Sequence, residues 1–206
     1  MPLLPILLCA ASVAFAAIYA IGFAPGAPSP ARSLVKTGAV AALALLGATV
    51  RAPLPVTAAL VCGAVGDGCL SRPDTAAFLA GMAAFGLGHL LYALWAFDPA
   101  GVIPCLWPGV AVAILAASTE LWLTPRTGAL RWPVRAYVAL IALMALAALT
   151  RGTPFVVAGA ALFLLSDLLL ALDIFILKPA PPTVQRLIWT AYWLGQAMII
   201  KGSLAP

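Results

Sequence analysis

The chain has 206 residues, of which 65% are hydrophobic and 8% are charged, with 11 Lys and Arg against 6 Asp and Glu. Soluble domains contain about 45–50% apolar and about 25% charged residues. This composition therefore excludes a soluble enzyme, a nucleic-acid-binding module and a disordered chain, and the mean hydropathy of +1.13 indicates a polytopic membrane protein. The net charge of +5 comes from a few loop cations, so no nucleic-acid partner is expected.

Apolar runs bounded by Pro, Gly and charged residues predict eight membrane-spanning helices. The runs cover residues 2–24, 34–50, 54–71, 75–97, 102–123, 133–149, 154–177 and 183–201. They lack the alternation of polar and apolar residues that marks the strands of a membrane barrel. The first run has no cationic N-terminal region and is long for a signal peptide, so we interpret it as a spanning helix. Because the loops are short, we expect an all-α membrane bundle with a single domain over residues 1–206.

Loop cations predict the orientation in the membrane. Eight of the 11 lie where the even-numbered helices begin: Arg32, Lys36, Arg72, Arg126, Arg131, Arg135, Lys178 and Arg186. The other three, Arg51, Arg151 and Lys201, lie at the opposite face. We therefore expect both termini outside and the cation-rich face in the cytoplasm, in a cytoplasmic (inner) membrane.

Cysteine and histidine usage gives no sign of a metal centre. The four cysteines, Cys9, Cys62, Cys69 and Cys105, show no metal-ligand spacing and no C-x-x-C motif, so we interpret them as small packing residues. His89 is the only histidine, whereas a zinc site needs three or four ligands. We expect neither a metal nor a cofactor.

Four of the six acidic residues fall inside the predicted spans, where a charge costs at least a few kcal/mol. Asp67 and Asp167 follow the prolines that open their helices by 12 and 13 residues, which places both about 18–20 Å into parallel helices. Both should lie about 10 Å from the cytoplasmic boundary. We predict that they form a catalytic pair; the alternative for each is a structural hydrogen bond. Glu120 and Asp173 lie nearer the cytoplasmic ends, and we expect them to be solvated or paired with loop Arg.

The sequence around the two aspartates is similar. Gly66-Asp67-x-x-Leu70 resembles Ser166-Asp167-x-x-Leu170, and Tyr92 follows Asp67 by 25 residues, as Tyr192 follows Asp167. This offset of 100 residues is compatible with a parallel duplication of four plus four helices.

Other polar side chains project into the spans and are candidate substrate contacts: Lys36, His89, Tyr92, Tyr137, Tyr192 and Gln196. Phe78, Phe85, His89 and Tyr92 recur at helical spacing and so form one stripe. This stripe could face a ligand or could pack against other helices. Counted along its helix, His89 should lie about 21 Å from the cytoplasmic face, some 10 Å off the level of the aspartates. Lys36, Arg72 and Arg135 could hold a lipid phosphate, although the usual enrichment of cations in cytoplasmic loops also explains Arg72 and Arg135.

Five motifs occur in order along the chain: Gly66-Asp67-x-x-Leu70, Phe78-x-x-Gly81-x-x-x-Phe85-x-x-x-His89-x-x-Tyr92, Pro133-Val134-x-x-Tyr137 with Met144, Phe163-x-x-Ser166-Asp167, and Tyr192-x-x-x-Gln196. Together they resemble the motifs of the YhhN-type lysoplasmalogenase family. The chain departs from the family where Lys36 is followed by Thr37 instead of Pro, and where Asp173 replaces Asn or another polar residue. The resemblance implies hydrolysis of the vinyl-ether bond of lysoplasmalogens, which releases a fatty aldehyde and a glycerophospho-base.

Vinyl-ether hydrolysis requires a general acid, a negative charge near the resulting oxocarbenium ion, and a base for water. Two carboxylates in different surroundings supply these roles, as they do in glycosidases, because close carboxyl groups in a low dielectric do not both ionise. The alternatives are a proton-coupled transporter, in which intramembrane acids relay protons, and a lipid-binding scaffold. The expected partners are a lysophospholipid substrate and membrane lipids; the sequence does not indicate an oligomeric state.

Overall fold

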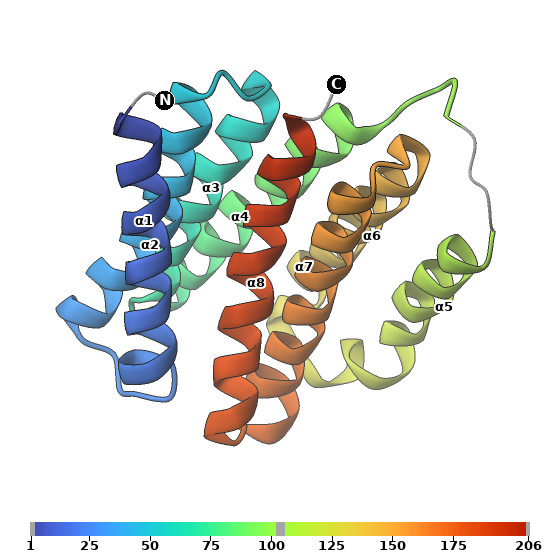
Figure 1. The fold of residues 1–206 in the computed structure, drawn as a ribbon. Helices are drawn as coiled ribbons and strands as arrows, with labels where there is room; N and C mark the ends of the chain where they lie inside the picture. The colour runs from blue at the N-terminus through green and yellow to red at the C-terminus, as the bar shows by residue number, and fades with distance from the viewer. Residues whose placement is uncertain (1–2, 102–105, 205–206) are drawn as a thin grey trace.

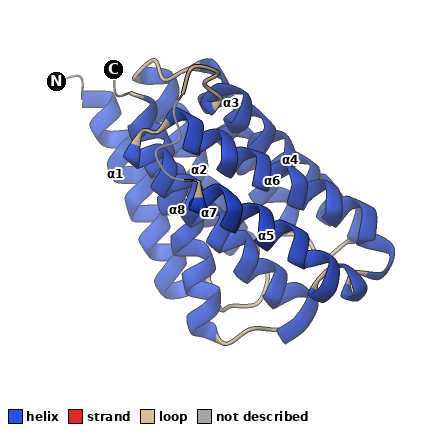
Figure 2. Cartoon of the chain, turned by 90° about the vertical axis from the view of Figure 1, so that its right-hand side faces the viewer, coloured by secondary structure: helices blue, strands red, loops and turns tan. Residues whose placement is uncertain are grey.

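The computed structural model describes residues 3–101 and 106–204, and these residues form helices joined by loops (Figures 1 and 2). This confirms the all-α membrane bundle. Its eight long helices are α1 (Leu3–Ile18), α2 (Pro30–Thr49), α3 (Leu54–Leu70), α4 (Thr75–Ala96), α5 (Trp107–Trp122), α6 (Arg131–Arg151), α7 (Pro154–Leu172) and α8 (Pro182–Ser203). Cys105 and the first residues of the predicted spans 2–24 and 102–123 lie outside the described residues.

Local capping explains where several helices begin and end. Helix α2 starts at Pro30, four residues earlier than predicted, because Ser29 caps it: the Ser29 Oγ accepts the Arg32 N–H at 3.1 Å. Helix α6 ends at Arg151 and is capped by Gly152, whose φ of 68° lies in the left-handed region that glycine adopts without strain. Single π-helical turns, Tyr19–Phe23 and Asp173–Leu177, extend α1 and α7.

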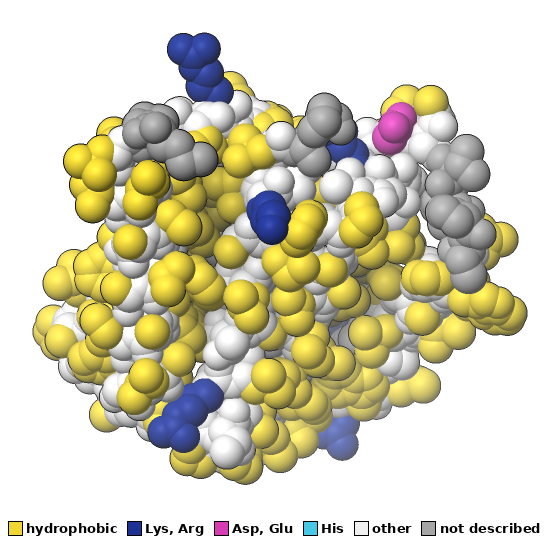
Figure 3. Space-filling view, viewed as in Figure 1, with side chains coloured by type: hydrophobic (Ala, Val, Ile, Leu, Met, Phe, Trp, Pro, Cys, Tyr) yellow, Lys and Arg dark blue, Asp and Glu magenta, His cyan; other side chains and the backbone are white. Residues whose placement is uncertain are grey.

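Helix length and composition fit a chain that crosses a membrane several times. Six helical stretches of the described residues are long and apolar enough to span: Leu3–Phe23, Pro30–Thr49, Thr75–Ala96, Trp107–Arg126, Gly128–Arg151 and Pro154–Leu177. Helix α3 is apolar but has 17 residues, or about 26 Å, which is slightly shorter than a hydrocarbon core of about 30 Å. Hydrophobic side chains cover most of the face in Figure 3.

Helices that follow one another in the chain pack side by side, with the exception of α4 and α5. Helix α4 packs against α6, and α8 also contacts α2 and α3, so that helices from both halves surround a common interior. The tightest approach is between α7 and α8, where a Cβ on Gly159 would lie 2.7 Å from the Gly195 carbonyl oxygen. Helix α5 packs mainly against α6 and lies to one side of the bundle in Figure 1.

Candidate active site

The interior of the bundle contains a chamber of about 480 Å³, a volume typical of ligand pockets. Helices α2 to α8 and the π-helical turn after α1 contribute to its wall, which is largely apolar. The polar side chains that border the chamber include Lys36, Asp67, Tyr137, Asp167 and Tyr192. Both predicted catalytic aspartates therefore border one chamber, although they come from helices 100 residues apart in the chain.

Asp67 lies 13 residues after Leu54 in α3, and its side chain is fully buried. The Lys36 Nζ lies 2.9 Å from Asp67 Oδ1, an ion pair that lacks hydrogen-bond geometry. The Tyr192 hydroxyl donates to Asp67 Oδ2 at 2.9 Å. Each carboxylate oxygen thus has its own partner, and the ammonium group of Lys36 compensates a negative charge that would otherwise be costly to bury.

A glycine one position before Asp67 makes room for the ring that positions Tyr192. A Cβ on Gly66 would lie 2.6 Å from the ring of Phe85. Phe85 packs edge-on against Tyr192, with ring centroids 5.6 Å apart and an interplanar angle of 78°. Adjacent residues of α3 therefore serve both functions: Asp67 supplies the carboxylate, and Gly66 leaves space for Phe85, which packs against Tyr192.

Asp167 lies 13 residues after Pro154 in α7, and its side chain is 12% exposed. The Tyr137 hydroxyl donates to Asp167 Oδ2 at 2.6 Å, and His89 Nε2 lies 3.2 Å from the same oxygen. The predicted offset of about 10 Å between His89 and the aspartates is therefore wrong. That estimate counted residues from opposite ends of two helices assumed to stand upright, and it left out the reach of the side chains.

The protonation of His89 can be assigned from its neighbours. His89 is fully buried, and its Nδ1 lies 3.4 Å from the Met144 Sδ, which can only accept a hydrogen bond, so Nδ1 carries a hydrogen. The single hydrogen of the Tyr137 hydroxyl points to Asp167 at the shorter distance. The contact between His89 Nε2 and Asp167 Oδ2 is then made by a proton that sits on one of these two atoms.

An aromatic side chain connects the two carboxylate clusters. The ring of Phe163 lies edge-on to both His89 and Tyr192, with centroid distances of 4.7 and 5.2 Å. Phe163 is itself buried in the core. Its contacts hold His89, the partner of Asp167, and Tyr192, the partner of Asp67, at fixed positions relative to each other.

Tyr92 and Gln196, predicted as substrate contacts, do not border the chamber. Both are buried, and the Tyr92 hydroxyl donates to Gln196 Oε1 at 3.0 Å, behind Tyr192. We therefore assign them to support of the wall. The proposed four-plus-four duplication predicts that Tyr92 matches Tyr192, but Tyr192 donates to an aspartate and Tyr92 does not. The polar contacts of the two halves thus differ at this site.

Residues that the sequence did not single out as substrate contacts also border the chamber. Tyr19 packs against Trp189 with ring centroids 4.4 Å apart and an interplanar angle of 49°, and the Arg32 guanidinium lies 5.6 Å from the centroid of the Tyr19 ring. A sequence signal for Arg32 exists: Ser29 followed by Pro30 is a typical helix start, which predicts that Arg32 lies inside the helix and not in the loop. Asp173 also borders the chamber and accepts the Ala180 N–H at 2.6 Å. It is half-buried, and of the two expected alternatives, solvation or a pair with a loop Arg, the described residues show no ion pair with an Arg.

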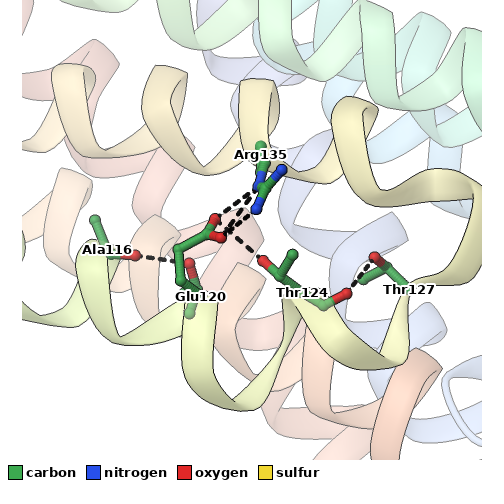
Figure 4. Close-up of polar contacts among 6 residues, drawn as sticks. Ala116, Glu120, Thr124, Thr127 and Arg135 are labelled. Atoms are coloured by element: carbon green, nitrogen blue, oxygen red, sulfur yellow. Dashed lines mark hydrogen bonds and ion pairs between the residues drawn. The ribbon is translucent and has the colours of Figure 1, made fainter.

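Glu120 is paired with a loop-proximal Arg, as expected. The Arg135 Nε donates to Glu120 Oε1 at 2.9 Å and the Nη2 donates to Oε2 at 2.5 Å, which joins α5 to α6 (Figure 4). Arg72 and Arg135 do not border the chamber, so a phosphate-binding role for either lacks support here. Among residues 3–101 and 106–204, no three His, Cys, Asp or Glu side chains are grouped as metal ligands.

The arrangement can be compared with known proteins. Residues 31–203 match the model of the YhhN family. The chain belongs to the YhhN family. It is 41% identical over 149 residues to "Lysoplasmalogenase TMEM86B" of Homo sapiens, which covers 71% of this chain and 62% of that protein. It is 39% identical over 151 residues to "Lysoplasmalogenase TMEM86B" of Sus scrofa, which covers 68% of this chain and 59% of that protein.

A third relative, "Lysoplasmalogenase TMEM86A" of Bos taurus, is 35% identical over 152 residues, or 68% of this chain and 61% of that protein. The chain thus spans about three fifths of the length of the curated relatives it matches. No solved structure matches it. The family assignment and the apolar helices together establish a multi-pass membrane protein, and they confirm the resemblance derived from the motifs.

Proposed function

We propose that this YhhN-family protein hydrolyses the vinyl-ether bond of lysoplasmalogens, giving a fatty aldehyde and a glycerophospho-base. The observation that carries the proposal is that Asp67 and Asp167 border one largely apolar chamber, each with a tyrosine hydroxyl as donor. The names of the relatives, all lysoplasmalogenases, support the substrate class.

Asp167 is the proposed general acid. It shares a proton with His89, and it borders the chamber whereas the fully buried His89 does not. Delivery of this proton to the second alkenyl carbon converts the first alkenyl carbon and the ether oxygen into an oxocarbenium ion. The Tyr137 hydroxyl, 2.6 Å from Asp167 Oδ2, stabilises the carboxylate that the acid becomes.

Asp67 is the proposed carboxylate that opposes the oxocarbenium charge and serves as base for water. The Lys36 ammonium group, 2.9 Å from Asp67 Oδ1, compensates the negative charge of this carboxylate. Water adds to the first alkenyl carbon and loses a proton to the base. The resulting hemiacetal then collapses: its hydroxyl gives a proton to the Asp167 carboxylate, the bond between the first alkenyl carbon and the ether oxygen breaks, and the glycerol oxygen takes up the proton held by Asp67. The aldehyde is released, and both aspartates return to their starting states.

The cations at one end of the bundle support a proposal for the orientation of the chain and of the site in the membrane. Asp67 and Asp167 lie toward the C-terminal ends of α3 and α7, at the end of the bundle where the eight cations of the even-numbered helix starts gather. By the positive-inside rule, we propose a site nearer the cytoplasmic face of a cytoplasmic membrane, with both termini outside. Reporter fusions to each terminus that are active only in the cytoplasm should therefore be inactive.

The decisive experiment uses purified protein in detergent, where a transporter has no compartments to separate. Incubation with a lysoplasmalogen should release aldehyde, and an ester-linked lysophospholipid of the same chain length should not. Asp67→Asn and Asp167→Asn should each abolish aldehyde release. Asp74→Asn is the matched control, because Asp74 caps α4 through its bond to the Ala77 N–H and asparagine caps equally well.

Full activity of a folded Asn variant at Asp67 or Asp167 would remove that residue from the mechanism. Absence of aldehyde from the wild-type protein would refute the proposed activity altogether.

A further inference from the structure

Helix α5 forms one wall of the chamber without packing closely against the helix on the far side. Its chamber-facing residues, Val112, Leu115, Ala116 and Thr119, recur at helical spacing and are joined by Trp122 and Leu123 further along. Helix α5 packs against α6, whereas direct packing between α5 and α7 is slight at most. The chamber occupies the space between their facing sides.

The facing side of α7 is apolar and runs directly to the proposed general acid. Leu164, Leu168 and Ala171 border the chamber on the same helix as Asp167. Leu164 lies one turn before Asp167, and Leu168 follows it in the chain. An apolar chain held between α5 and α7 would therefore begin at the carboxyl group that is proposed to protonate it.

The outer side of α5 is also apolar. Trp107, Val110, Ile114 and Leu121 are exposed large hydrophobic side chains, as expected for a helix with lipid on one side. The bidentate pair of Arg135 and Glu120 ties the C-terminal end of α5 to α6 (Figure 4). Helix α5 thus separates the chamber from the surrounding hydrocarbon and is fixed to α6 at the cation-rich end.

We propose that the space between α5 and α7 is the binding site for the hydrocarbon chain of the substrate, which reaches the chamber laterally from the bilayer between these two helices. The inference rests on the proposed function and adds to it where the chain is held and how it arrives. From Val112 to Leu123 the α5 wall extends about 16 Å, close to the thickness of one hydrocarbon leaflet. A single extended chain whose ether bond lies at Asp167 matches this wall in length and polarity.

Neighbouring alanines of α5 offer a matched test. Ala116 borders the chamber, whereas Ala117 is exposed and does not border it. Ala116→Trp should fill the proposed chain site and lower kcat/KM for a long-chain lysoplasmalogen by at least about tenfold, mainly through KM. Hydrolysis of an alkenyl analogue with a four-carbon chain should change much less. Ala117→Trp, which adds the same ring to the outer side, should leave both substrates unaffected.

A second measurement does not depend on turnover. A lysophospholipid with an alkyl-ether chain and a photoreactive diazirine at the chain end should label α5 and α7 peptides in the wild-type protein. Excess unlabelled alkyl-ether lysolipid should suppress this labelling, and so should Ala116→Trp, but Ala117→Trp should not. Labelling by this probe tests the chain site even if the wild-type protein releases no aldehyde. Absence of aldehyde would refute the proposed reaction but not the chain site.

Two results would overturn the chain site. One is an equal effect of Ala116→Trp and Ala117→Trp on long and short substrates. The other is labelling that excess unlabelled lipid does not suppress, or labelling confined to helices other than α5 and α7.

Discussion

The hydroxyl group of Tyr137 provides the sharpest test of the proposed acid. It donates to Asp167 Oδ2 at 2.6 Å and lies 3.0 Å from His89 Nε2, so it contacts both groups that share the acidic proton. Tyr137→Phe removes this one oxygen and keeps the ring that packs edge-on against His89 at a centroid distance of 5.2 Å. The variant should fold, because the apolar contacts of the ring are retained.

The expected loss follows from the kind of hydrogen bond that is removed. A hydrogen bond to a charged group contributes about 1.5–3 kcal/mol. Asp167 becomes a carboxylate when it gives up its proton, so the bond strengthens as the transition state is approached. Since about 1.4 kcal/mol corresponds to a factor of ten in rate, Tyr137→Phe should lower kcat by about 10- to 150-fold.

The assay is aldehyde release from a lysoplasmalogen in detergent, with kcat and KM determined separately. Tyr92→Phe is the matched control, because the Tyr92 hydroxyl donates to Gln196 Oε1 and contacts neither aspartate. The control should lower the unfolding free energy by about 1–3 kcal/mol, since it leaves a buried amide oxygen without its donor, while kcat changes by less than about threefold.

A Tyr137→Phe protein that unfolds at the wild-type temperature and keeps its full kcat would refute the assignment of Asp167 as the acid supported by Tyr137. A loss of kcat of the same size in Tyr92→Phe would show instead that any buried hydroxyl of this region is needed for structure alone.

Three further predictions concern the surroundings of the two aspartates. Gly66→Ala places a methyl group 2.6 Å from the Phe85 ring, so it should displace that ring and weaken the hydrogen bond from Tyr192 to Asp67. Both thermal stability and aldehyde release should fall. Wild-type values of both would contradict the close packing. Met144→Leu removes the acceptor of the His89 Nδ1 hydrogen at nearly constant volume and leaves a buried ring N–H without a partner, so it should lower the free energy of unfolding by about 1–3 kcal/mol. An unchanged free energy of unfolding would show that the sulfur does not hold the ring. Glu120→Gln weakens the partly exposed link between α5 and α6, so it should change kcat for a short-chain alkenyl substrate by less than about threefold; a large loss would place Glu120 in the chemistry.

Most of the helices could be predicted from sequence because each apolar run reports on its own segment. The run at 154–177 matches α7 and its π-helical turn residue for residue, and the run at 54–71 differs from α3 by one residue. The start of α2 was placed four residues late, because the cap at Ser29 involves a single side-chain contact and not the hydropathy of the run. Where a cap and not a change in hydropathy sets the end of a helix, composition does not predict its first or last residue.

The candidate site was predictable in its acids and less so in their partners. A carboxylate in an apolar span is conspicuous, and this selected Asp67 and Asp167. Their partners depend on how each helix is rotated and tilted in the bundle, which the sequence does not give. Lys36, expected at a lipid phosphate, pairs with Asp67, and His89, expected at another level, contacts Asp167. Tyr92 and Gln196 share the polarity of the other candidates but face each other behind the wall.

The amino-acid sequence alone determined that this protein is a helical membrane bundle with two buried aspartates in similar settings, because hydropathy and helical rise act along one segment at a time. Tertiary structure decided which side chains meet: the Lys36–Asp67–Tyr192 cluster, the Tyr137–Asp167–His89 cluster, and the separation of α5 from α7 that leaves a chamber between them. Those contacts depend on how helices rotate, tilt and approach, and small residues such as Gly66, Gly159 and Gly195 set these quantities through packing between segments far apart in the chain.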